Sequence, residues 1–150
     1  MATNYRPIAQ KIHDEKRTDS FAKITQLLFK RDRKAAPYFL PQPERPLTTS
    51  ERDVVERLLR DTPLEFQKQS SGLRVVGRCG CGKCPTIFFQ PHTADLKECD
   101  LASMQGIDDF NGLVGAVLLH DNGKLTQLEF FSIDGHDPYL TPKPGTLTSM

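Results

Sequence analysis

The chain has 150 residues, of which 37% are hydrophobic and 26% charged, and its formal net charge is +1. This length and balance suit one globular domain that buries its own core without disulfide bonds. A net charge this small excludes a strong overall attraction to nucleic acids or to membranes.

The sequence contains no apolar run of the roughly 18 residues that a membrane span needs. Its first residues also lack the apolar core of a secretory signal. We therefore expect a cytoplasmic protein whose thiols are kept reduced, with no membrane contact.

The charges are distributed unevenly along the chain. Residues 1–34 carry nine Lys or Arg and four Asp or Glu, whereas residues 100–150 carry two and seven. Two interpretations are open: the two ends lie close together and neutralise each other, or one end binds a charged partner.

Residues 1–17 are polar and predict a flexible basic arm. A helix is expected to begin near Thr18, because Phe21, Ile24, Leu27 and Leu28 follow at helical spacing. Four basic residues end this helix and are the best candidates for binding a partner or a nucleic-acid backbone: Lys30, Arg31, Arg33 and Lys34.

Residues 37–46 contain four prolines and predict an extended connector. An alternative is that this proline-rich segment binds in a groove of another protein. Thr48 and Ser50 are candidate N-caps for a second helix, with Glu51 and Asp53, each three residues further on, as capping-box partners. That helix should end before Pro63, and a short further helix should follow Pro63 and end near Gly72.

Two β-hairpins are expected after the helices. The first joins a strand at Leu73–Val76 to a strand at Thr86–Phe89. The second joins residues 113–120 to residues 124–133 through Asn122–Gly123, a dipeptide that favours the left-handed backbone of a two-residue turn. Apolar residues do not alternate cleanly in its second strand, which indicates a bulge or burial on both faces. Residues 134–150 predict a C-terminal tail.

The first hairpin carries three cysteines with the spacing C-x-C-x-x-C: Cys79, Cys81 and Cys84. The intervening glycines allow a tight turn, so three sulfur atoms can converge on one point. Tetrahedral zinc needs four thiolate or imidazole ligands. Cys99 and His92, in the loop that follows, are the candidates for the fourth ligand.

Two other interpretations of these cysteines stay open. They can be small apolar side chains that fill space in the interior. Alternatively, Cys81–Cys84 is a C-x-x-C motif in which Lys83 lowers a thiol pKa, although Pro85 and the apolar run after it predict a strand rather than the helix of a thioredoxin-like protein.

The run V-V-G-R-C-G-C-G-K-C-P-T, followed later by a hairpin ending L-E-F-F, resembles a group of small uncharacterised bacterial proteins. The similarity covers residues 47–133. Lys83 is an extra residue relative to the tighter C-G-C-P of that group. The resemblance implies a bacterial cytosolic origin and a compact α+β domain, and it carries no activity to transfer.

The sequence therefore predicts an α+β fold, with two or three N-terminal helices packed on an antiparallel sheet of about four strands. Residues 18–133 would form the single domain. No catalytic motif is recognisable, so we expect a non-enzymatic protein-binding module, of the kind that neutralises a bacterial toxin as an immunity protein does. The alternative is a zinc-stabilised domain that binds nucleic acid through the basic end of its first helix.

Overall fold

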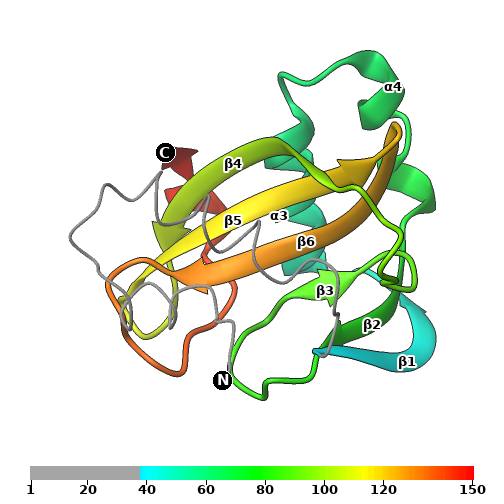
Figure 1. Cartoon of the computed structure of the whole chain (residues 1–150). Helices are drawn as coiled ribbons and strands as arrows, with labels where there is room; N and C mark the ends of the chain where they lie inside the picture. The colour runs from blue at the N-terminus through cyan, green and yellow to red at the C-terminus, as the bar shows by residue number, and fades with distance from the viewer. Residues whose placement is uncertain (1–37) are drawn as a thin grey trace.

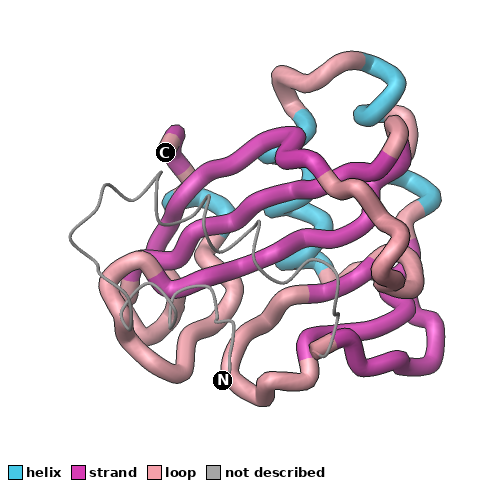
Figure 2. The backbone as a smooth tube through the Cα atoms, in the orientation of Figure 1, coloured by secondary structure: helices cyan, strands magenta, loops and turns pink. Residues whose placement is uncertain are grey.

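The computed structural model describes residues 38–150. The arm predicted for residues 1–17, the helix predicted after Thr18 and its four basic residues (Lys30, Arg31, Arg33 and Lys34) lie outside the described residues. Figure 1 shows the arrangement of the described elements, and Figure 2 shows how much of the backbone is strand.

The described chain is built around one antiparallel sheet of seven strands in the order β1-β2-β3-β6-β5-β4-β7. The strands are β1 (Phe39–Pro46), β2 (Arg74–Cys79), β3 (Ile87–Phe88), β4 (Cys99–Ile107), β5 (Leu113–Asp121), β6 (Lys124–Ser132) and β7 (Thr148–Ser149). Two α-helices, α3 (Thr49–Leu59) and α4 (Leu64–Gln67), and two 3₁₀ turns, Ser70–Gly72 and Pro144–Thr146, complete the described elements.

The predicted fold of two or three helices on about four strands is wrong. Among residues 38–150 the structure contains seven strands and two α-helices, one of which has only four residues. The two predicted hairpins are present, but three further segments join them as β1, β4 and β7. β1 and β7 pair with strands that are distant in the sequence, and local patterns do not report such pairing. β4 pairs with its neighbour β5, but the mixed order of polar and apolar residues over 101–112 does not indicate a strand.

The proline-rich connector forms β1, at one edge of the sheet. Among residues 38–150 its only strand partner is β2, and the pairing register shifts between Pro41 and Arg45. Proline has no amide hydrogen, so it is tolerated in a strand whose outer side has no neighbour to bond. The segment predicted to be extended is thus part of the sheet, as its edge strand β1.

Helix α3 begins where the sequence predicted. The Thr48 side chain accepts a hydrogen bond from the Glu51 amide at 3.1 Å, and the Glu51 carboxylate accepts one from the Thr48 amide at 2.9 Å. Such a reciprocal capping box is worth about 1 kcal/mol. Arg45 at the end of β1 adds two hydrogen bonds to the same carboxylate, which ties the helix start to the edge strand.

One face of the sheet packs against α3 (Figure 1). Alternate residues of β5 and β6 meet the helix in the main core, whose most deeply buried members include Val54, Val55, Val114, Leu118, Leu125 and Leu128. At about 25 cal/mol per Å² of buried apolar surface, this contact is the largest stabilising term in the fold.

The opposite face of β5 and β6 is buried as well. Val117, Leu119 and Phe131 are each at most 1% exposed, although they alternate with the residues that face α3. The Phe131 ring lies against Gly115, where a β-carbon would overlap it. Burial on both faces explains why the apolar residues of β6 do not alternate cleanly.

The second hairpin turns at Asn122 (φ 55°) and Gly123 (φ 85°), the two left-handed positions that the dipeptide predicted. A bulge follows directly, because Leu119 pairs with Gln127 while His120 pairs with Leu125. Thr126 therefore has no partner opposite it in the ladder. The predicted bulge is confirmed.

Residues 134–150 return along the sheet. Tyr139 and Leu147 belong to the main core and are 5% and 2% exposed, and β7 pairs with β4. Arg57 of α3 donates to the carbonyl oxygens of Pro144 and Leu147 at 3.3 and 2.9 Å. Among the described helices, none is long and apolar enough to cross a membrane.

Candidate metal centre

The cysteine-bearing turn, residues 79–84, connects β2 to β3 and is called the Cys turn below. The Cys79 amide donates to the Thr86 carbonyl at 3.1 Å, which closes the turn, and the Gly80 amide donates to the Tyr38 carbonyl at the start of β1. Gly82 has a φ of 78°, a backbone conformation that residues with a β-carbon rarely adopt. The chain is therefore folded back tightly enough to bring its three cysteines together.

The sulfur atoms of Cys79, Cys81 and Cys84 all lie within 4.8 Å of one another. Sulfur ligands of a tetrahedral zinc ion, each about 2.3 Å from the metal, are about 3.8 Å apart. The Cys81 and Cys84 sulfurs are 3.4 Å apart, so they are not joined by a disulfide. The predicted convergence is confirmed: these three side chains can bind one metal ion.

The backbone of the Cys turn favours a negative charge on sulfur. The Lys83 amide donates to the Cys81 sulfur at 3.3 Å. Hydrogen bonds from the Cys79 and Cys84 thiols, together with this amide, lower the pKa of Cys81. The same contacts raise the pKa of Cys79, because its thiol acts as a donor to Cys81 and Cys84. A cluster that already holds one thiolate at neutral pH is suited to a cation.

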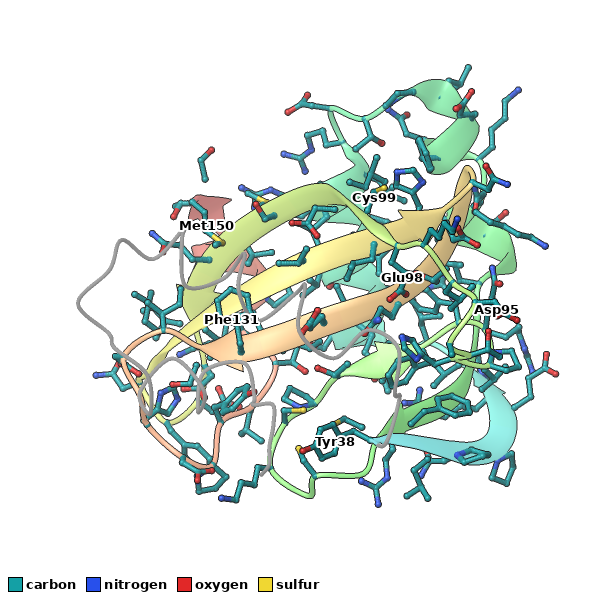
Figure 3. All side chains as sticks on the ribbon, in the orientation of Figure 1. Tyr38, Asp95, Glu98, Cys99, Phe131 and Met150 are labelled. Carbon is teal, nitrogen blue, oxygen red and sulfur yellow. The ribbon has the colours of Figure 1, made fainter. Side chains whose placement is uncertain are left out.

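The structure does not bring Cys99 or His92 to this cluster. Cys99 begins β4, where it pairs with His120, and β3, β6 and β5 lie between it and β2 in the sheet. Figure 3 shows Cys99 far from Tyr38, which lies beside the Cys turn. His92 follows the far end of β3. Three of the five predicted ligands thus meet, and the fourth coordination position is filled by neither of the two candidates.

His92 belongs instead to a buried polar cluster around Glu98. The Glu98 carboxylate lies 3.2 Å from His92 Nε2 and accepts from Thr126 Oγ1 and Gln127 Nε2. The bulge in β6 brings both of these neighbouring side chains to one carboxylate. Burial alone would raise the pKa of Glu98, but hydrogen bonds from His92 and Thr126 outweigh it and hold the pKa at about 2.

A second polar cluster joins the β4–β5 loop to the segment after β6. We call it the clamp, and it consists of Asp108, Ser132, Asp134 and His136. The Asp108 carboxylate is fully buried and accepts from three backbone amides, those of Phe110, Gly112 and Leu140, each at 2.9 Å. It also accepts from His136 Nε2 at 3.0 Å.

The other ring nitrogen of His136 faces the Asp134 carboxylate, and the Ser132 hydroxyl lies 3.1 Å from it. Burial alone would lower the pKa of His136, but its hydrogen bonds to Asp108 and Asp134 raise it. A carboxylate at each ring nitrogen, together with this raised pKa, favours the protonated imidazolium form of His136. An imidazolium cannot take a proton from serine, so Ser132, His136 and Asp108 do not act as a catalytic triad despite their proximity.

The clamp presents two large apolar side chains to solvent. Phe110 is 57% and Leu140 is 40% exposed. Both of their amides donate to Asp108, so the two residues are fixed on either side of one buried carboxylate. We call them the Phe110–Leu140 patch. In the sequence they stand 30 residues apart, and no local pattern connects them.

The Cys turn and the clamp are neighbours. Lys83 Nζ, between the second and third cysteines, lies 3.2 Å from the carboxylate of Asp137, which follows the clamp histidine. Both groups are about half exposed, so this ion pair adds little stability. It does place the Cys turn and the patch-bearing loops at the same end of the molecule.

No protein-family model, no curated protein and no solved structure matches this chain.

Proposed function

We propose that this protein is a non-enzymatic protein-binding module that engages its partner through the Phe110–Leu140 patch, with a zinc ion bound by the Cys turn as a structural support. The observation that carries the proposal is the presentation of two exposed apolar side chains by one buried, fully hydrogen-bonded carboxylate. Protein interfaces depend on a few such rigid apolar or aromatic anchors.

The charge around the patch indicates the kind of partner. Three exposed acidic residues stand in the two loops that carry the patch: Asp109, Asp134 and Asp137. Acidic groups at the rim of an apolar anchor accelerate association with a basic protein and exclude an acidic one. A toxin with a basic surface, inhibited as by an immunity protein, is the partner we propose.

The Cys turn supports this role as a structural zinc site rather than as a catalytic one. Three thiolates at suitable separations supply three of the four ligands of a tetrahedral zinc ion. Thiolates are soft ligands, which favour zinc over magnesium or calcium. When bound, zinc would fix the turn that lies beside the clamp through Lys83 and Asp137.

The proposal is tested by affinity capture from an extract of the source cells with quantitative mass spectrometry. The bait is the full chain, compared with the double variant Phe110→Ser/Leu140→Ser. The matched control is Leu64→Ser, because Leu64 is 62% exposed on α4 and makes no contact with the clamp. We expect a basic protein that wild type and the Leu64 variant capture and that the double variant does not.

The immunity role is tested with that captured protein. Its expression alone should arrest growth, and co-expression of the wild-type chain, but not of the double variant, should restore growth. Identical capture by all three baits would refute the patch as the interface. Capture of a protein that does not arrest growth would support the patch as the interface but reject the inhibitor role.

A further inference from the structure

The Cys turn combines an exposed sulfur with a buried one at close range. Cys81 is exposed, whereas Cys84 is partly buried and packs against the main core. Their sulfur atoms are 3.4 Å apart. Cys99 provides an internal comparison, since it is also exposed but has only a backbone carbonyl, that of Lys97 at 3.9 Å, near its sulfur.

We propose that the Cys81–Cys84 pair is a reversible oxidation site that a hydroperoxide converts to a disulfide, and that this conversion removes two of the three metal-binding thiolates. The oxidation is the new element. Only the accompanying release of metal rests on the zinc site proposed above.

The chemistry balances with a hydroperoxide as the oxidant. The Cys81 thiolate attacks one peroxide oxygen, the O–O bond breaks, and an alcohol or water leaves while Cys81 becomes a sulfenic acid. The Cys84 thiolate then attacks the Cys81 sulfur, an S–S bond forms, and the hydroxyl leaves as water. Two thiols lose two electrons and two protons, and the peroxide gains them.

The turn permits this step with little movement of the backbone. A disulfide needs its two β-carbons about 3.8 Å apart, a separation that a C-x-x-C turn readily provides. Gly82, between the cysteines, has no atom within 4 Å of the position of a β-carbon, so the turn has room to adjust. The exposure of Cys81 sets the order of the two steps, because peroxide in solution reaches Cys81 before it reaches Cys84.

The structural effect of oxidation would be transmitted to the clamp through Lys83. This residue lies inside the C-x-x-C segment and forms an ion pair with Asp137. A covalent bond between the two sulfurs would draw together the side chains on either side of Lys83, whose own side chain lies against the loop that carries His136. The Phe110–Leu140 patch is therefore within reach of a redox change at the Cys turn.

The test treats the full-length wild-type protein with a small excess of hydrogen peroxide, with zinc and after removal of metal by a chelator. Peptide mapping by mass spectrometry follows the oxidation of each cysteine over time. We expect the Cys81–Cys84 disulfide to form about tenfold faster than any product at Cys99 in the metal-free protein. Dithiothreitol should reverse it, and in the zinc-loaded protein a zinc-sensitive dye should report release in step with it.

Two variants sharpen the result. Cys99→Ser should oxidise as wild type does, and Cys81→Ser should form no disulfide at Cys84. A first product at Cys99, a disulfide that uses Cys79, or a sulfinic acid at Cys81 without a disulfide would each overturn the proposal. Disulfide formation in a protein that binds no zinc when zinc is supplied would reject the zinc site and leave the oxidation site standing.

Discussion

The clamp and the Cys turn are neighbouring polar clusters that differ in how far hydrogen bonds within the protein satisfy their polar groups. In the clamp, Asp108 receives four hydrogen bonds and His136 has a carboxylate at each ring nitrogen, so the cluster is complete without a ligand. In the Cys turn, three sulfurs face one another, and the Lys83 amide donates to the Cys81 sulfur. The comparison separates a structural element from a binding site.

A structural cluster and a binding site should respond differently to a chelator, and this response is the largest effect we expect. Zinc at 1,000 times its dissociation constant should stabilise the folded protein by about 4 kcal/mol. Thermal unfolding with zinc and with chelator measures the difference. Cys84→Ser should abolish it and Cys99→Ser should retain it. Equal melting temperatures with and without zinc in wild type would contradict the metal site.

Removal of the clamp's charge should have the next largest effect. Asp108→Asn leaves an amide nitrogen facing the Leu140 amide or His136, and it leaves the imidazolium without its buried partner. We expect a loss of about 3 kcal/mol in the free energy of unfolding, measured with urea. The control Asp109→Asn, at an exposed neighbour, should change stability by less than about 0.5 kcal/mol. Similar values for the two variants would show that the clamp does not stabilise the fold.

The ring of His136 packs against Gly112, and this contact offers a steric test. A β-carbon at Gly112 would overlap the His136 ring, so Gly112→Ala should displace the ring and cost about 2 kcal/mol. Gly145→Ala is the matched control, because no atom lies within 4 Å of its β-carbon position. If urea unfolding finds both variants near wild type, the ring is free to move and the clamp is looser than its hydrogen bonds indicate.

The clamp should also respond to pH. The folded pKa of His136 is raised, so its stabilisation is complete below the unfolded value of about 6.5 and is lost as pH rises through the folded pKa. Asp108, with a pKa of about 2, stays ionised throughout this range.

Stability should therefore decline above neutral pH by no more than about 1.4 kcal/mol per pH unit, the limit for one proton. Urea unfolding of the metal-free protein in a pH series measures this decline. The His136→Gln variant should lack this pH-dependent part of the stability. A variant that declines as steeply as wild type would assign the pH dependence to other groups.

The features that the sequence determined are those set by neighbours in the chain. Asn122–Gly123 fixes a two-residue turn because both positions need a left-handed backbone, and the Thr48–Glu51 capping box fixes the start of α3 because its partners stand three residues apart. The Cys turn belongs to this group, since six residues with two glycines suffice to bring three sulfurs together.

Only the tertiary structure decided which segments complete the sheet and which polar residues meet. β1 and β4 lack a clear strand signal in the sequence and depend on partners supplied by the sheet edges. Asp108 and His136 stand 28 residues apart, and Cys99 is separated from the other cysteines by three strands. Such contacts follow from the order of strands in the sheet, which is a property of the folded chain as a whole and is not encoded in any local pattern.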